Sequence, residues 1–144
     1  MLRPILSVLV LVLFAGCSTS RPERKIILPP GANPSGNWSP GILADGTLYV
    51  SGMGGEDAAG KLPGTFEGEM KQSLDNIGAV LKEAGMSSSD VVSVQVYLTD
   101  VETFERMNAV YRTYFKEPRP ARTTVVVAKL VGPGNIEITV TARK

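Results

Sequence analysis

Residues 65–99 read TFEGEMKQSLDNIGAVLKEAGMSSSDVVSVQVYLT, and within them the spacing of the apolar side chains changes from a helical to an extended period. In the first part these side chains recur every three or four positions: Phe66, Met70, Leu74, Ile77, Leu81 and Ala84. That spacing places them on one face of a helix, which Gly85 ends. In the second part Val92, Val94, Val96 and Leu98 alternate with Val91, Ser93, Gln95 and Tyr97. The stretch therefore predicts a helix over 65–84, followed by a strand over 90–99 with one apolar and one mixed face.

The segment before this stretch predicts short strands joined by loops. Residues 25–28 form a short candidate strand, and the breaker-rich run PPGANPSGNWSPG over 29–41 is a loop by composition. The β-rich runs 42–44 and 47–51 flank Asp45-Gly46, a dipeptide suited to a tight hairpin. Five glycines within 52–64 indicate another loop, of a kind that often borders functional sites.

The segment after it predicts a second helix and two more strands. Asp100 is a suitable N-cap, and the following apolar stripe consists of Phe104, Met107, Tyr111 and Tyr114. Pro118 and Pro120 end this helix, and β-rich runs cover 121–130 and 135–143. The predicted order is β, β, β, α, β, α, β, β.

This order predicts an α+β fold in which one sheet is covered on one face by two helices. The opposite face would carry a mixed set of side chains: Tyr49, Ser51, Gln95, Tyr97, Thr139 and Thr141. Such a face is too polar for a dry core and too β-branched for an ordinary wet surface. We therefore expect self-association to bury it, with polar clefts left between the subunits.

The amino-acid composition excludes several classes of catalytic and metal-binding site. The chain has 144 residues, which suits one domain, and its net charge of +1 with 6% aromatic residues gives no electrostatic footprint for nucleic acid. It contains no histidine, which excludes a Ser-His-Asp triad, a Cys-His dyad and the commonest zinc ligands. The single cysteine, Cys17, allows no intrachain disulfide and no multi-cysteine metal site. We expect no metal site.

The N-terminal residues resemble a targeting signal. Arg3 precedes an apolar run from Ile5 to Ala15 that is too short to span a bilayer. The small pair Ala15-Gly16 before Cys17 resembles a bacterial lipobox, although Phe14 stands where Leu is usual. We expect 1–16 to be a lipoprotein signal peptide, 17–32 the lipidated Cys17 with its tether, and 33–144 the folded domain. The alternative is a plain secretory signal with a chance cysteine.

From these predicted segments we expect the protein to lie at a membrane surface of the bacterial cell envelope. After removal of 1–16, basic and acidic side chains are equal in number, so charge would not hold the domain there. Acyl chains on Cys17 could hold the domain there, because each methylene buried in the membrane contributes about 0.8 kcal/mol to the binding free energy. Ser18 is not the aspartate of the inner-membrane retention signal, so in a Gram-negative host we expect the outer membrane, facing the periplasm.

Five short motifs, in this order along the chain, resemble the RidA/YjgF family, also called the L-PSP or endoribonuclease L-PSP family. They are LYVSG at 48–52, QSLDNI at 72–77, MNAVY at 107–111, PART at 120–123 and IEI at 136–138. The resemblance covers about Asn33 to Arg143. It implies a chorismate-mutase-like single-domain protomer in a homotrimer with sites between subunits, and hydrolysis of reactive 2-iminoacids or their enamines to 2-ketoacids and ammonia without metal or organic cofactor.

The resemblance also assigns site residues. Arg122 matches the family's arginine for the substrate carboxylate, a role suited to the planar guanidinium fork, and its alternative role is a surface ion pair. The other matches line the substrate: Thr124, Ser51, Gly52, Trp38 and Asn108. Each has a structural alternative. These are a strand filler for Thr124, a strand end for Ser51 and Gly52, loop packing for Trp38, and a helix-to-loop hydrogen bond for Asn108.

One departure concerns the chemistry. Deaminating members carry a glutamate after the Ile-Glu-Ile sequence, and this chain has Thr139 there. Threonine can hold water but cannot take its proton at neutral pH, whereas general acid-base assistance contributes about 10²–10⁴-fold. Glu137 projects from the same strand face and is a candidate replacement, or a structural charge. Three hypotheses remain: an imine hydrolase, a non-catalytic trimeric binder of small carboxylates, and, ranked last, a ribonuclease.

Overall fold

The computed structural model describes residues 23–33 and 36–144. The predictions for the signal peptide, for Cys17 and for the start of the tether lie outside the described residues. Within the described residues, no helix is long and apolar enough to cross a membrane.

The secondary structure follows the predicted order. The six strands are β1 (Arg24–Ile27), β2 (Gly41–Ala44), β3 (Thr47–Met53), β4 (Val91–Leu98), β5 (Ala121–Val126) and β6 (Ile136–Arg143). The two α-helices are α1 (Phe66–Glu83) and α2 (Phe104–Tyr114), and the short 3-10 turns Ser88–Asp90 and Val101–Thr103 precede β4 and α2. Local chemistry sets the ends: the Thr65 hydroxyl caps α1 by accepting from Gly68 N, and Gly85 beyond it has a φ of 69°.

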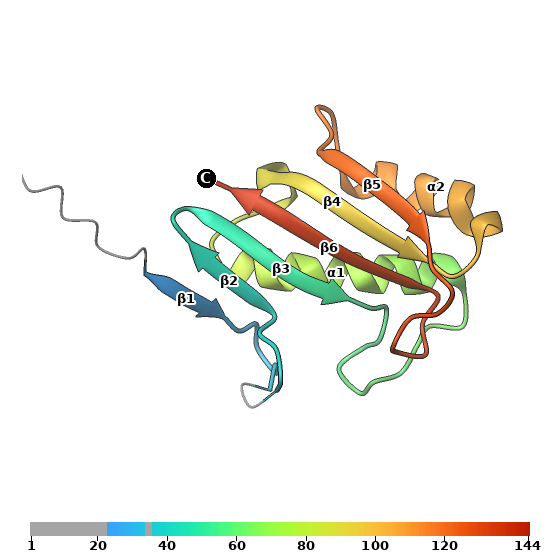
Figure 1. The fold of residues 1–144 in the computed structure, drawn as a ribbon, viewed down its shortest axis with the longest axis horizontal. Helices are drawn as coiled ribbons and strands as arrows, with labels where there is room; N and C mark the ends of the chain where they lie inside the picture. The colour runs from blue at the N-terminus through green and yellow to red at the C-terminus, as the bar shows by residue number, and fades with distance from the viewer. Residues whose placement is uncertain (1–22, 34–35) are drawn as a thin grey trace, which may run out of the picture.

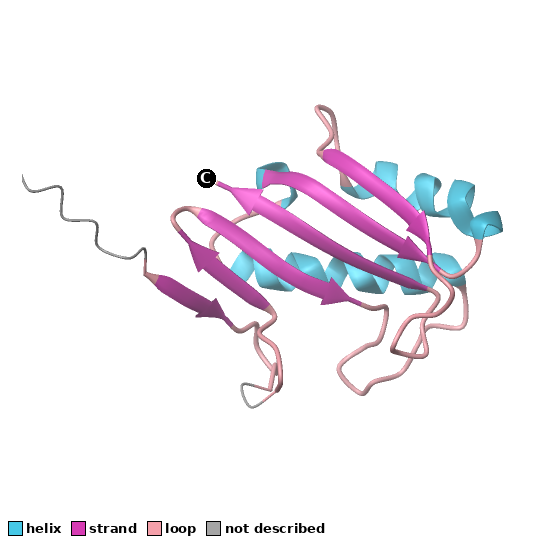
Figure 2. Cartoon of the chain, viewed as in Figure 1, coloured by secondary structure: helices cyan, strands magenta, loops and turns pink. Residues whose placement is uncertain are grey.

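The strands form one mixed sheet in the order β1-β2-β3-β6-β4-β5, with both helices on one face (Figures 1 and 2). All neighbours are antiparallel except β4 and β5, which α2 connects as a parallel pair. The Asp45-Gly46 turn joins β2 to β3, with φ values of 48° and 70° that match the predicted hairpin. The fold is thus the single α+β domain predicted from the sequence.

The core lies between the sheet and the helices. It includes Leu74 and Ile77 of α1, Met107 of α2, and Ile138 and Val140 of β6, all at most 3% exposed. The prediction for the start of β4 was wrong: Val91 is buried and Val92 is 51% exposed. The register of β4 against β6 shifts between Val91 and Ser93, and this irregularity reverses the alternation at the first two positions.

The sheet also begins earlier than the predicted domain boundary at Asn33. Strand β1 pairs with β2 within the segment predicted as tether, and Ile27 is 1% exposed. Among the described residues, the sheet therefore begins at Arg24, within the segment assigned to the tether.

The face of the sheet opposite the helices carries the mixed side chains that the alternation predicts. Tyr49 of β3 pairs with Thr141 of β6, and Gln95 of β4 pairs with Thr139 of β6. Tyr49 is 55% exposed, and Val125 of the edge strand β5 is 42% exposed. A single chain therefore presents apolar area on this face and an unpaired backbone edge along β5.

Candidate functional site

Arg122 lies near the start of β5, on the side of the sheet that faces α2. Its guanidinium carbon stands 4.6 Å from the ring centroid of Tyr111 and 5.8 Å from that of Phe104, and Nη1 is 3.7 Å from the Met107 sulfur. In residues 23–33 and 36–144 no carboxylate forms an ion pair with it. The aromatic rings of α2 thus support the cation while its N–H groups keep their capacity to bind an anion.

Arg122 is one of the residues that line a cavity of about 310 Å³ between α2 and the start of β5; the others are Asn108, Tyr111, Arg112, Arg119 and Pro120. Arg119 Nη1 donates to Glu117 Oε1 at 2.5 Å. The Asn108 amide donates to Glu105 Oε1 at 3.4 Å, a long contact. The cavity wall is therefore cationic and carries an amide donor.

Tyr111 is the buried polar group of this cavity. It is 3% exposed, and its hydroxyl has no hydrogen-bond partner among the described residues. Burial raises the pKa of its phenol, and the positive charges of Arg122 and Arg119 oppose that rise. The phenol therefore stays neutral near pH 7, and its hydroxyl lies beneath the cavity surface while its ring packs against Arg122.

Thr124 follows Arg122 on the same face of β5, since both pair with helix-facing residues of β4. Its hydroxyl is buried and has no hydrogen-bond partner in the described part of the chain. The structure thus brings Arg122, Thr124 and Asn108 to one side of the sheet.

A second cavity of about 310 Å³ opens on the other face of the sheet; it is lined by Gly52, Tyr97, Val127, Lys129, Leu130, Val131, Glu137 and Thr139. Glu137 pairs with Tyr97 across β6 and β4, and it is the only carboxylate in this lining. A Cβ added to Gly52 would lie 2.1 Å from Glu137 Oε1, so the absence of a side chain there makes room for the carboxylate. Thr139 donates its hydroxyl proton to the Val50 carbonyl, which leaves its oxygen only as an acceptor.

Ser51 lies near the end of β3, and Trp38 lies in the loop before β2. The β3–β6 register shifts between Val50 and Met53, and Ser51 sits in this irregularity, where its hydroxyl donates to Ser39 O at 2.7 Å. This bond ties the preceding loop to the strand that carries Gly52. Trp38 is 58% exposed and lines a different cavity, of about 350 Å³, beside Pro40 and the middle of α1.

The sheet separates the predicted site residues into two groups within one chain. Arg122, Thr124 and Asn108 lie on the helix side, whereas Gly52, Glu137 and Thr139 lie on the open side. No single ligand can touch both groups of one protomer through the sheet.

Sequence reasoning missed several lining residues. Arg112, Arg119 and Tyr111 flank Arg122, and Tyr97 and Lys129 flank Glu137. Tyr97 was expected on the open face but was not assigned to a site. The basic residues in the run from Arg112 to Arg122 were a signal that could have pointed to the first cavity.

Glu69 is a further polar residue that sequence reasoning missed. It is 2% exposed on α1, and its Oε1 accepts from the backbone N–H groups of Asn135 and of Ile136, the latter at 3.0 Å. Its Oε2 accepts from Asn135 Nδ2 at 3.1 Å. The carboxylate thereby fixes the start of β6, the strand that carries Glu137 and Thr139.

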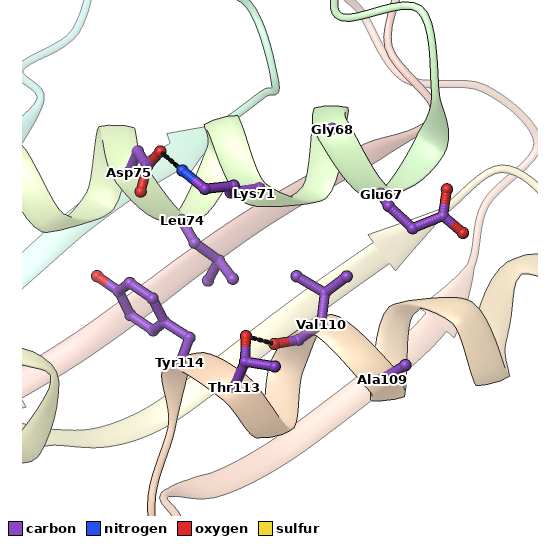
Figure 3. A pocket seen from close by; sticks show the side chains of 9 residues that line it. All are labelled: Glu67, Gly68, Lys71, Leu74, Asp75, Ala109, Val110, Thr113 and Tyr114. Carbon is purple, nitrogen blue, oxygen red and sulfur yellow. Dashed lines mark hydrogen bonds and ion pairs between the residues drawn. The ribbon is translucent and has the colours of Figure 1, made fainter.

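The outer surfaces of the helices enclose a groove that none of the predicted site residues line. Its cavity of about 580 Å³ lies between α1 and α2, beside Leu74, Val110 and Tyr114 (Figure 3). Burial raises the pKa of Tyr114, and the charge of Asp75 adds to the rise.

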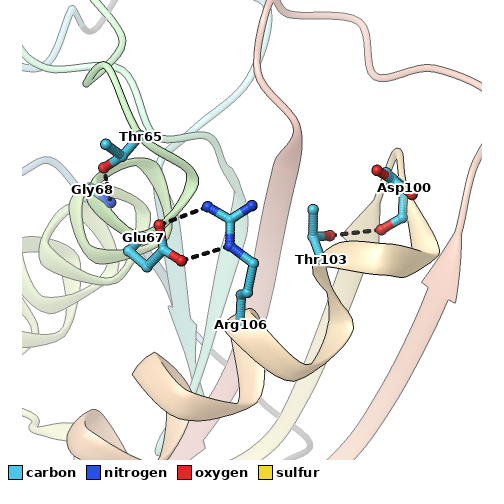
Figure 4. Close-up of polar contacts among 6 residues, drawn as sticks. All are labelled: Thr65, Glu67, Gly68, Asp100, Thr103 and Arg106. Carbon is cyan, nitrogen blue, oxygen red and sulfur yellow. Dashed lines mark hydrogen bonds and ion pairs between the residues drawn. The ribbon is translucent and has the colours of Figure 1, made fainter.

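An ion pair joins the two helices at one end of this groove. Arg106 Nε and Nη2 donate to the two oxygens of Glu67 at 2.6 and 2.8 Å (Figure 4). The hydrogen bonds from Arg106 lower the pKa of the Glu67 carboxyl to about 2. No group of three or more acidic or cysteine side chains suited to a metal ion occurs in the described residues.

Comparison with known proteins agrees with this fold. The family described as Endoribonuclease L-PSP matches residues 30–144. A Bos taurus protein named 2-iminobutanoate/2-iminopropanoate deaminase is 43% identical over 118 residues, which cover 80% of this chain and 86% of that protein.

Solved structures give the same result. The YjgF gene product from E. coli has a TM-score of 0.76 at 31% identity, covering 83% of this chain and 98% of that one. RidA from an Antarctic Psychrobacter has a TM-score of 0.75 at 34% identity, covering 82% and 94%. The chain belongs to the endoribonuclease L-PSP family, the family of RidA and YjgF.

Proposed function

We propose that this protein hydrolyses small reactive 2-iminoacids, or their enamine tautomers, to 2-ketoacids and ammonia. The observation that carries the proposal is the Arg122 guanidinium, which is supported by two aromatic rings and forms no ion pair with a carboxylate in the described residues. A planar fork of N–H donors in this state suits the carboxylate of a 2-iminoacid. The name of the Bos taurus relative supports the same reaction.

The reaction needs little beyond orientation and a water molecule. With the carboxylate held by Arg122, water adds to the imine carbon, a C–O bond forms, and the nitrogen takes up a proton. Collapse of the resulting carbinolamine breaks the C–N bond, and ammonia leaves as the ketone forms. Glu137 is our candidate for holding the attacking water and accepting its proton, since it is the carboxylate of the open-face cavity. Thr139 supplies an acceptor oxygen beside it.

The site requires residues from two protomers in this proposal. Arg122, Thr124 and Asn108 would come from one subunit, and Glu137, Thr139, Gly52 and Ser51 from the open face of its neighbour. The exposed side chains of that face and the free edge of β5 support such an assembly, which we propose to be a homotrimer. Trp38 lines a different cavity and has no role in this proposal.

A second candidate function is binding without catalysis. Its specific support is Thr139, which stands where deaminating members carry a glutamate and which donates its proton to the Val50 carbonyl. In that case the protein would hold small carboxylates at Arg122 and release them unchanged. Ribonuclease activity is ranked last of the three candidates, because the net charge of +1 gives little attraction for RNA.

We also propose that the protein is anchored at the cell envelope through a lipid on Cys17. The lipobox-like sequence before that residue supports this proposal. Mass spectrometry of the protein from membranes tests it directly: a diacylglycerol-modified Cys17 at the N-terminus is expected, and an unmodified N-terminus elsewhere would contradict it.

A coupled assay tests the reaction. An amino-acid oxidase generates the iminoacid from 2-aminobutanoate, and the rate of ammonia release is compared with and without purified protein. We expect acceleration that Arg122→Gln abolishes and that Glu137→Gln lowers by about 10²-fold or more. The matched control is Arg106→Gln, which removes the same charge from the outer face of α2.

Three further results separate the candidates. If the wild type does not exceed background but Thr139→Glu does, the chain is a binder that lost the chemistry. Without any acceleration by either protein, hydrolysis is not its function. In that case, if 2-oxobutanoate protects the wild type against thermal unfolding but does not protect Arg122→Gln, the hypothesis of binding without catalysis is retained.

A further inference from the structure

We infer that the Arg122 cavity selects ligands with a second acidic group, namely 2-imino and 2-keto dicarboxylates derived from acidic amino acids. This inference rests on the proposed function for the reaction, but not for the binding preference. It concerns Arg112 and Arg119, which the function proposed above does not use.

Three guanidinium groups line one small cavity. Arginine stays protonated at any physiological pH, so Arg112, Arg119 and Arg122 bring three positive charges to about 310 Å³. Among the described residues, Glu117 is the only carboxylate paired with any of them, through Arg119. Glu105 reaches the Asn108 amide and none of the three arginines. The charges of Arg112 and Arg122 therefore lack a paired carboxylate among the described residues. Two such positive charges are complementary to a dianion.

The buried phenol of Tyr111 supports the guanidinium that would bind the ligand. Its hydroxyl is a donor with no partner in residues 23–33 and 36–144, although the residue is 3% exposed. The hydroxyl oxygen itself has almost no accessible surface, so the contribution of Tyr111 to the cavity is its ring, which packs 4.6 Å from the Arg122 guanidinium carbon and holds that cation at the wall.

Size and shape favour a dicarboxylate over a larger anion. The cavity is at the small end of the range for ligand sites, about 300–1,000 Å³. In a four- or five-carbon dicarboxylate, one carboxylate would bind Arg122 and the other would bind Arg112, whose charge has no paired carboxylate among the described residues, beside the Glu117-paired Arg119. A monocarboxylate of equal length would leave an apolar end facing two guanidinium groups.

Binding of stable keto analogues tests the preference. Calorimetry on the purified protein would compare 2-oxoglutarate with 2-oxobutanoate. We expect 2-oxoglutarate to bind at least about tenfold more tightly, the effect of one additional favourable charge interaction. Arg112→Gln should reduce this ratio by several-fold and Arg119→Gln by less, because Glu117 already pairs with Arg119, and the double variant should bring the ratio to about one.

A matched control removes the same charge elsewhere. Arg143 lies at the end of β6 and outside this cavity, and Arg143→Gln should keep the wild-type ratio. A ratio that falls equally in this control would overturn the inference, because net charge alone would then explain it. A wild-type ratio near one would also overturn it.

The outcomes remain distinguishable from those for the proposed function. The iminoacids formed from glutamate and from 2-aminobutanoate are compared by kcat/KM in the same coupled assay. A protein that prefers 2-oxoglutarate but hydrolyses neither iminoacid supports the inference and refutes the hydrolase. A protein that hydrolyses both with equal kcat/KM and binds both analogues equally supports the hydrolase and refutes the inference.

Discussion

Replacement of Glu69 tests whether a buried carboxylate on α1 fixes the strand that carries the proposed catalytic residues. In Glu69→Ala the N–H groups of Asn135 and Ile136 lose their acceptor, and Ile136 is completely buried. A hydrogen bond to a charged group contributes about 1.5–3 kcal/mol, and part of the loss is recovered where water reaches Asn135. We therefore expect the free energy of unfolding to fall by about 3–5 kcal/mol, a large share of a typical total of about 5–15 kcal/mol.

The conservative variant gives a graded result. In Glu69→Gln the amide oxygen can still accept from both backbone N–H groups, but its NH₂ would face the Asn135 amide, which also donates. A loss of about 1–2 kcal/mol is expected from this single mismatch. Glu67→Ala is the control, since Glu67 lies on the same helix but is about half exposed, and its loss should be much smaller than that of Glu69→Ala.

Urea unfolding followed by circular dichroism measures these changes, at one fixed protein concentration because oligomerisation shifts apparent stability. The midpoint should move while the slope stays constant. If Glu69→Ala costs no more than the Glu67→Ala control, the carboxylate does not hold β6 and the reasoning is refuted. Iminoacid hydrolysis should fall more in Glu69→Ala than in Glu69→Gln, because Glu137 directly follows Ile136.

Three other changes are predicted. Leu74→Ala leaves a hole in the core beneath α1 and should lower the free energy of unfolding by about 2–5 kcal/mol, measured by urea titration. Gly52→Ala places a Cβ where the flexible Glu137 carboxylate lies, so ammonia release should fall while the thermal midpoint changes little; unchanged activity would remove Glu137 from the site. The folded-state pKa of Glu67 lies below its usual 4.5, so this ion pair stabilises fully above about pH 4.5 and is lost as the pH falls toward about 2. Thermal unfolding of Arg106→Gln should therefore show a weaker pH dependence in that interval than the wild type, and equal slopes would refute the assignment.

The order of elements could be predicted from the sequence because it rests on local chemistry. Apolar spacing along α1, the Asp45-Gly46 turn and the Thr65 cap act within a few residues. The same alternation predicted which side chains of β4 and β6 face away from the helices. It failed at Val91 and Val92, since a register shift depends on the partner strand and leaves no mark in the local pattern.

The composition of the candidate site depended on tertiary structure. Motifs supplied Arg122 and Glu137, but alternation within each strand cannot say which face of β5 aligns with which face of β6. The parallel pairing of β5 with β4 placed Arg122 on the helix side, opposite Glu137. Local sequence patterns thus predicted the elements and the chemical groups. Which of these groups share a cavity depends on how strands far apart in the chain pack together, because hydrogen-bond register is a property of pairs of strands.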